Sequence, residues 1–93
     1  GAVSALVAEQ MAIGVQTLLR TDWGLSITGI AGPGGGTDAK PVGLVYVGIA
    51  GPQSLVSHRE YRISVSQGRD WIRDVSASNA LDLLRRYLLN PSK

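Results

Sequence analysis

The residues best placed to do chemistry in this 93-residue sequence belong to a glycine-rich run, Gly29–Gly36, interrupted by Pro33. Because glycine has no side chain, the backbone of such a run can approach a phosphate or a planar ring closely, and its successive N–H groups can bind an anion. The run does not match G-x-G-x-x-G followed by a helix, and Lys40 comes too late for the phosphate-binding pattern G-x-x-x-x-G-K-[ST]. Spacing alone therefore leaves both a ligand-binding loop and a plain surface loop open.

Cationic side chains follow at two informative positions. Lys40 lies between the glycine-rich run and Pro41, where it either offers positive charge to a phosphate or carboxylate or is simply solvated. Arg69 opens the last predicted helix, whose terminus already carries about half a positive charge. An arginine there favours an anion bound between it and the helix terminus, although a solvent-directed side chain or a local pairing with Asp70 stays open.

The sequence lacks the sets of residues that a metal site, a catalytic triad or a pair of catalytic carboxylates would need. The sequence has no cysteine and a single histidine, His58, so a metal site would need carboxylates for every other ligand. We therefore expect no metal and no cofactor, and a surface position for His58. Ser26 and Ser64 have no partners that would make them nucleophiles, and no Ser-His-Asp or paired-carboxylate arrangement is visible.

The composition is that of a globular protein, with 44% hydrophobic and 17% charged residues. The net charge of +2 is small, and Arg85–Arg86 is the densest basic cluster, which falls short of the basic stripe of a nucleic-acid binder. No apolar run approaches the about 18 residues of a membrane helix, and the N-terminus has no signal-peptide pattern. We expect a cytoplasmic protein without a nucleic-acid or membrane partner.

Predicted helices and strands position the glycine-rich run and the two cationic residues. A helix is predicted over residues 4–20, with Ser4 as its N-cap and an apolar stripe formed by Val7, Met11, Val15 and Leu18. Alternation of apolar and polar residues from Trp23 to Ile30 predicts a strand that leads straight into the glycine-rich run. That run therefore lies at the C-terminal end of a strand, where α/β sheets commonly bind ligands.

The second half of the sequence predicts two more strands and a helix. Val42–Ala50 is apolar on both faces and predicts a strand covered on both sides. The turn-forming residues 51–54 join it antiparallel to an edge strand over Ser57–Val65. A helix over Arg69–Leu89 follows, with an inward stripe of Ala77, Ala80, Leu81, Leu84 and Leu88. The order helix, strand, strand, strand, helix predicts an α/β fold in which two helices barely cover the sheet, which suggests further structure upstream.

Several strings together resemble one family. Gly1-Ala-Val-Ser4, Thr28-Gly-Ile-Ala-Gly-Pro33, Gly34-Gly-Gly-Thr37, Lys40-Pro-Val-Gly43 and Gly68-Arg-Asp70 follow the order and spacing of the CinA C-terminal family, the nicotinamide mononucleotide (NMN) deamidases or nicotinamide-nucleotide amidases. The resemblance implies a three-layer α/β/α sandwich with a mixed sheet and a homodimer. It also implies that residues 1–93 are the C-terminal part of a single domain whose N-terminal part is absent.

The resemblance further implies hydrolysis of the NMN carboxamide to nicotinic acid mononucleotide and ammonia. In the family a serine of an E-S-C-T-G-G motif is the nucleophile, and a tyrosine and a lysine of Y-S-N-E-A-K activate it. Neither motif occurs here, and the only lysines are Lys40 and Lys93. The matching residues form a substrate-binding wall, with Arg69 also in a supporting catalytic role: Thr28, Gly29, Ile30, Ala31, Gly32, Gly34, Gly35, Lys40 and Arg69.

Other functions stay open beside this one. Because the serine and lysine motifs are missing, the chain can also be read as a catalytically inactive module that binds a nucleotide or a protein. The historical link of the family to competence and DNA damage suggests direct DNA binding, against which the small net charge argues.

Overall fold

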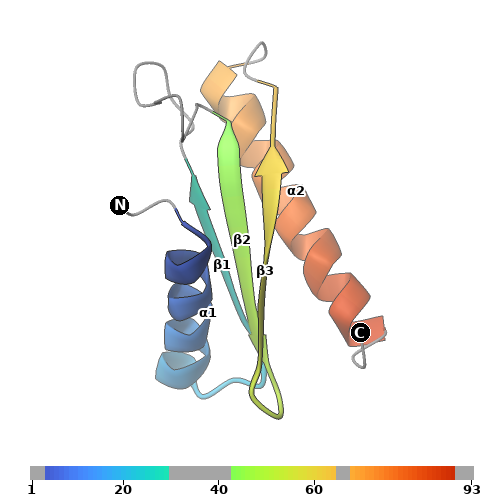
Figure 1. Cartoon of the computed structure of the whole chain (residues 1–93). Coiled ribbons are helices and arrows are strands. Elements are labelled where there is room, and N and C mark those ends of the chain that lie inside the picture. Colours follow the sequence, from blue (N-terminus) through green and yellow to red (C-terminus); the bar gives the residue numbers. More distant parts are fainter. Residues whose placement is uncertain (1–3, 30–42, 65–67, 90–93) are drawn as a thin grey trace.

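The computed structural model describes residues 4–29, 43–64 and 68–89. Along the chain lie helix α1 (Ala5–Leu19), strands β1 (Gly24–Gly29), β2 (Leu44–Gly51) and β3 (Leu55–Arg62), and helix α2 (Gly68–Leu89). Figure 1 shows the helices on opposite sides of the sheet, with α1 over one face and α2 over the other. The predicted order of elements and the α/β fold are confirmed. Within the described residues, neither helix combines the length and apolarity needed to cross a membrane.

Helix α1 begins and ends on the capping chemistry that its sequence offers. The Ser4 hydroxyl accepts a hydrogen bond from the Val7 N–H at 3.1 Å, which satisfies one of the unpaired N–H groups of the first turn and confirms Ser4 as the N-cap. Arg20 takes the left-handed conformation, with φ 53°, and its N–H donates to carbonyl groups of the last turn.

The predicted apolar stripe of α1 does not face the sheet. Met11, Val15 and Leu18 are 44%, 37% and 80% exposed. The residues that pack on the sheet are Ala8 and Ala12, both fully buried. Their short side chains let the helix backbone approach the sheet closely, which the larger side chains on the other faces of α1 would prevent.

The described strands form one antiparallel sheet in the order β1-β2-β3. Ser26, Gly48 and His58 are neighbours across it, and all three therefore lie on the face toward α1. The predicted double burial of β2 is confirmed, and so are its antiparallel pairing with β3 and the edge position of β3 among these strands. The parallel pair that a mixed sheet requires is not among the described strands.

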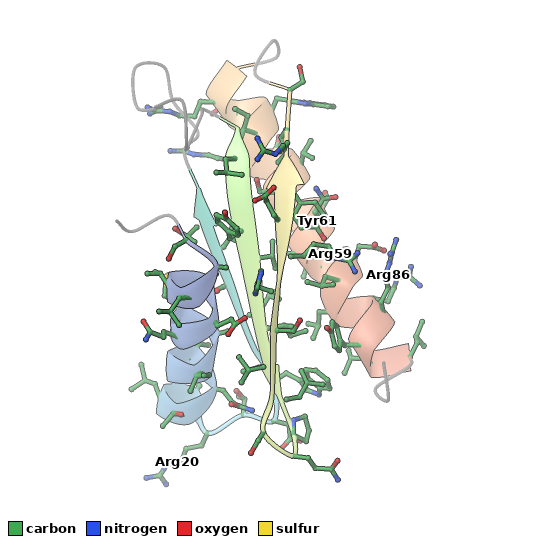
Figure 2. All side chains as sticks on the ribbon, viewed as in Figure 1. Arg20, Arg59, Tyr61 and Arg86 are labelled. Carbon is green, nitrogen blue, oxygen red and sulfur yellow. The ribbon has the colours of Figure 1, made fainter. Side chains whose placement is uncertain are left out.

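Helix α2 buries a different stripe from the one predicted. Ile72, Ser76, Ala80 and Leu83, spaced by one helical turn, are buried against the sheet, so of the predicted residues only Ala80 is buried. Ala77, Leu81 and Leu88 are exposed instead, as is Trp71. Ile72 joins Val45, Val47, Ala80 and Leu83 in the hydrophobic core of this layer. On β3, Tyr61 and Arg59 lie on the side toward α2, and Tyr61 packs against that core (Figure 2).

Candidate ligand-binding site

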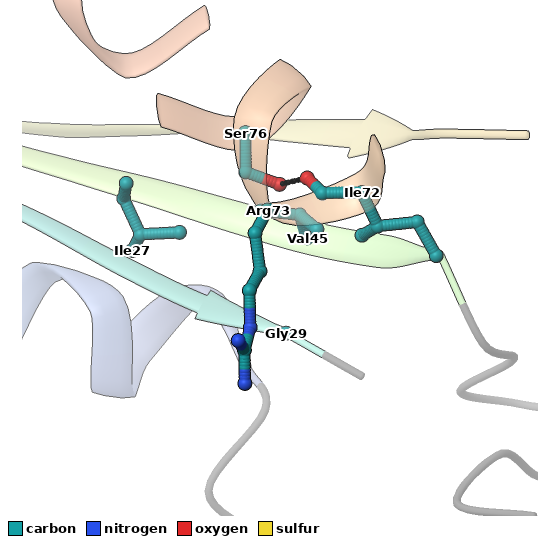
Figure 3. Close-up of a pocket in the computed structure, with 6 residues that line it drawn as sticks. All are labelled: Ile27, Gly29, Val45, Ile72, Arg73 and Ser76. Atoms are coloured by element: carbon teal, nitrogen blue, oxygen red, sulfur yellow. Dashed lines mark hydrogen bonds between the residues drawn. The ribbon is translucent and has the colours of Figure 1, made fainter. Parts of the chain in front are cut away.

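The C-terminal end of β1 and the first turns of α2 lie at the same end of the molecule (Figure 1). Side chains from both, together with β2, line a cavity of about 310 Å³. This volume is at the lower end of the range of small-molecule pockets, roughly 300–1,000 Å³. The lining residues, drawn in Figure 3, are Ile27, Gly29, Val45, Ile72, Arg73 and Ser76.

Most of the cavity wall is aliphatic. Ile27 and Val45 lie on the α2 face of neighbouring strands, and Ile72 closes the space from the helix. Val45 and Ile72 are almost fully buried and fixed in the core, whereas Ile27 is 42% exposed. A rigid apolar wall of this kind suits the face of a flat group.

Arg73 brings the positive charge. Its side chain leaves the second turn of α2 and extends across the cavity to place the guanidinium beside Gly29 (Figure 3). In the described part of the chain, the arginines that form ion pairs are Arg62, Arg85 and Arg86, and Arg73 is not among them. Its guanidinium donors therefore remain available to an anionic group.

Gly29 is at this position for a steric reason. A Cβ on Gly29 would lie 2.8 Å from the Leu44 carbonyl oxygen and 2.8 Å from Val45 Cγ2. Only glycine lets the end of β1 pass this close to β2. The chain therefore enters the glycine-rich run directly from the rim of the cavity.

Two buried serine hydroxyls donate to backbone carbonyl groups. Ser76 Oγ, at the cavity, donates to the Ile72 carbonyl at 2.6 Å, and Ser26 Oγ donates to the Ala8 carbonyl at 2.5 Å beneath α1. Neither is hydrogen-bonded to a side-chain base in these contacts, so neither is set up as a nucleophile. Among the residues that the structure describes, no group of three His, Cys, Asp or Glu side chains is placed to hold a metal ion.

A separate polar cluster lies on the α1 face of the sheet. His58 Nδ1 lies 2.6 Å from Glu9 Oε2 and so links β3 to α1, and the His58 side chain is 41% exposed, as predicted for a surface histidine. Tyr46 donates to Glu60 at 3.1 Å. This hydrogen bond raises the pKa of Tyr46, and partial desolvation adds to the effect. The cluster does not line the cavity between β1, β2 and α2, and we assign it no ligand.

Only part of the predicted binding wall falls in the described residues. Gly29 lines the cavity, Thr28 is the preceding, half-buried residue of β1, and Arg69 is exposed in the first turn of α2 and does not line the cavity. The other predicted contacts lie outside the described residues and stay predictions: Ile30, Ala31, Gly32, Gly34, Gly35 and Lys40.

Arg73 is one of the cavity residues that the sequence did not identify as part of a site. A signal was present, because Arg73 follows Arg69 by four residues, the spacing that places two side chains on one face of a helix. The sequence also indicated that Ile72 falls off the main stripe of α2 and is buried elsewhere, but it did not place Ile72 in a site.

Comparison with known protein sequences identifies the family and several relatives of this chain. The sequence profile of the CinA C-terminal domain matches residues 1–88. A "CinA-like protein" of Cyanothece sp. (strain PCC 7425 / ATCC 29141) is 70% identical over 89 residues, which are 96% of this chain and 21% of that protein. A "CinA-like protein" of Thermosynechococcus vestitus is 66% identical over 92 residues, 98% of this chain and 22% of that protein. The chain thus spans about a fifth of the length of these relatives.

Solved structures share the fold. The competence/damage inducible protein CihA from Agrobacterium tumefaciens superposes with a TM-score of 0.86 at 42% identity, over 92% of this chain and 52% of that one. A CinA superfamily protein from Klebsiella pneumoniae 700603 gives a TM-score of 0.84 at 26% identity, over 95% and 53% of the two chains. The chain spans about half of each solved chain.

Proposed function

This chain belongs to the CinA C-terminal domain family, whose profile matches residues 1–88. We propose that it forms the substrate-binding part of an NMN amidohydrolase. The reaction converts NMN and water to nicotinic acid mononucleotide and ammonia. In this proposal the chain supplies the substrate-binding loop and does not supply the serine nucleophile. The homodimer, which the resemblance implies, and the cytoplasmic location, which the sequence pattern led us to expect, are part of the same proposal.

One observation carries the proposal: the strand that leads into the glycine-rich run and the helix that begins at Gly68 share a cavity. The cavity combines an apolar wall with the guanidinium of Arg73. NMN carries a phosphate, which a guanidinium can bind, and a flat, positively charged pyridinium ring, whose face can lie against such a wall. The motif from Thr28 to Gly43 adds support, because its sequence follows the family pattern.

In this proposal the chain contributes substrate binding, whereas the nucleophile and its activating base come from motifs that do not occur in it. Amide hydrolysis needs a nucleophile and a base to activate it, and the family motifs that provide them do not occur in these 93 residues. What this chain contributes is binding and orientation, which hold the carboxamide in a reactive position. Lys40 is a binding residue in this scheme and does not replace the missing catalytic lysine.

The test uses the Cyanothece relative at its full length, because it is 70% identical over the shared region. We expect it to release ammonia from NMN at neutral pH and to form nicotinic acid mononucleotide in equal amount. We expect the 93-residue chain alone to release none. Absence of ammonia release from the full-length relative would overturn the proposed reaction.

The alternative is a binding module without chemistry, favoured by the absence of cysteine and of any lysine other than Lys40 and Lys93. It predicts micromolar binding of NMN to this chain by calorimetry, together with an inactive full-length relative. Turnover by the relative decides between the two proposals.

A further inference from the structure

We propose that two copies of this chain pair through the outer face of α2. The inference deepens the proposed function, of which the homodimer is a part, and it rests on that proposal for the presence of a second copy. Six exposed residues of α2 form this surface, which we call the α2 stripe: Trp71, Asp74, Ser78, Leu81, Arg85 and Leu88. The other described elements leave the side of α2 away from the sheet uncovered (Figure 1).

The α2 stripe has the spacing of a seam between two helices. Its residues alternate at three and four positions apart, which keeps them on one side of a helix over several turns. The residues buried against the sheet lie on the opposite side of α2: Ile72, Ser76, Ala80 and Leu83. From Trp71 to Leu88 the stripe runs for about 25 Å, at roughly 1.5 Å per residue, so a second helix can follow it for about five turns.

Two copies of the α2 stripe are complementary when they run antiparallel. Pairing about the midpoint of the stripe then matches three kinds of contact: Trp71 opposite Leu88 of the second copy, Asp74 opposite Arg85, and Ser78 opposite Leu81. Each contact occurs twice, because the two copies are related by a two-fold axis. Trp71, Leu81 and Leu88 are 47%, 63% and 53% exposed, so the pairing removes three large apolar side chains of each copy from water.

The charges of the stripe select this orientation. Antiparallel pairing puts Arg85 of the second copy opposite Asp74, which takes part in none of the ion pairs among the residues that the structure describes. Parallel pairing in register would place Asp74 opposite Asp74 and Arg85 opposite Arg85, and like charges repel. Arg85 already donates to Asp82 at 3.0 Å, but a guanidinium has five N–H groups and can reach a second carboxylate.

Charge reversal tests the pairing of Asp74 with Arg85. Sedimentation equilibrium of the 93-residue chain compares the unmodified protein with Asp74→Arg, Arg85→Asp and the variant that combines both. We expect the unmodified chain to dimerise at micromolar concentration, each single reversal to weaken dimerisation by about tenfold, and the combination to restore it. Circular dichroism checks that each variant is folded.

Arg86→Asp is the matched control. Arg86 contacts the same Asp82 as Arg85 does, at 2.9 Å, and its side chain is equally exposed, at 61% against 62%. It lies beside the α2 stripe, so the substitution removes the same kind of ion pair within α2 without placing a charge in the seam. We expect it to leave dimerisation unchanged.

Disulfide cross-linking tests the orientation without changing a charge. The sequence contains no cysteine, so introduced cysteines have no competitors. Antiparallel pairing places Trp71 opposite Leu88 of the second copy and keeps each far from its own equivalent. A mixture of the Trp71→Cys and Leu88→Cys chains should therefore form a disulfide-linked dimer under mild oxidation, whereas neither chain alone should do so.

The outcomes separate this inference from the proposed function. A dimer that resists both reversals, that the combined variant does not recover, or that gives no cross-link in the mixture has its interface elsewhere, and the inference is then wrong while the homodimer stands. A chain that stays monomeric at every concentration overturns the inference and the homodimer together. Neither result bears on the proposed reaction, which release of ammonia from NMN tests separately.

Discussion

Gly48 of β2 lies directly beneath Ala8 of α1, so that a Cβ on Gly48 would come within 2.1 Å of the Ala8 carbonyl oxygen. The same relationship recurs between Gly24 and Ala12, again at 2.1 Å. Ser26, beside Gly48 in the sheet, donates its hydroxyl to the Ala8 carbonyl. Helix and sheet are therefore in backbone contact along this line, and small side chains are required on both sides.

Gly48→Ala should consequently be strongly destabilising. The two shortest contacts would be with the Ala8 carbonyl group, which belongs to the backbone and cannot move aside as a side chain can. Overpacking of a core costs about 1–3 kcal/mol, and we expect this substitution to reach or exceed the upper part of that range. Urea denaturation followed by circular dichroism measures the loss.

Gly14→Ala is the matched control, because a Cβ at Gly14 meets nothing within 4 Å. It lies in α1, where alanine is the better helix former, so we expect a gain of up to about 1 kcal/mol. Equal stabilities of the Gly48→Ala and Gly14→Ala variants would contradict the close contact between α1 and the sheet.

Ser26→Ala tests the hydrogen bond within that contact. The Ser26 hydroxyl is buried and donates to a carbonyl that belongs to the helix, so its removal should cost about 0.5–1.5 kcal/mol. Ser78→Ala, at an exposed position of α2, should change the free energy of unfolding by less than about 0.5 kcal/mol. A Ser26→Ala variant as stable as Ser78→Ala would show that the buried hydrogen bond contributes nothing net.

The stability of α2 should depend on pH through Asp82. The hydrogen bond from Arg85 lowers the pKa of Asp82 below its usual 3.8, and the nearby charge of Arg86 acts in the same direction. Since the pKa is lower in the folded state, the stabilisation is present above the unfolded pKa and is lost as the pH falls through the folded value.

The measurement compares the unmodified chain with Asp82→Asn across pH 7 to pH 2. We expect the variant to be less stable at neutral pH and the difference to vanish at the acid end. Asp74→Asn, at an exposed position outside the ion pairs of α2, serves as the control. A stability difference for Asp82→Asn that persists unchanged at pH 2 would contradict the expected loss of the Asp82 ion pairs in acid.

The apolar residues exposed on α1 and α2 predict marginal stability and self-association. Leu18 and Leu19 are 80% and 63% exposed, whereas Leu83 is 4% exposed. We expect the isolated chain to unfold with a midpoint below about 65 °C. Leu18→Gln combined with Leu19→Gln should change the free energy of unfolding by less than about 0.5 kcal/mol per site and reduce self-association in sedimentation experiments.

Leu83→Ala provides the contrast, because it removes a core side chain and should cost about 2–5 kcal/mol. A loss of similar size for the Leu18 and Leu19 substitutions would show that the outer face of α1 is packed in solution. A sharp transition well above about 65 °C for the monomer would likewise contradict marginal stability.

The sequence was sufficient to predict the helices and strands, but it was not sufficient to predict which face of each helix is buried. Local capping and alternation predicted α1 from Ser4 onward and the strands at nearly their observed bounds. The inward face of α2 was predicted wrongly, and the apolar stripe of α1 is not the face that packs on the sheet, because each helix is apolar on more than one side. Hydrophobic periodicity alone cannot tell which apolar face is buried when a small-residue face is available.

For the site, the sequence located the glycine-rich run at the end of a strand and Arg69 at the start of α2, because both are local features. It did not identify Arg73, Ile72 or Ile27, which meet only when the helix crosses the sheet. What the sequence determined by itself was the order of elements, their caps and the family pattern, all of which depend on neighbours along the chain. The tertiary structure alone decided that Ala8 and Ala12, rather than the leucines of α1, contact the sheet, because Gly24 and Gly48 leave space only for a close backbone approach.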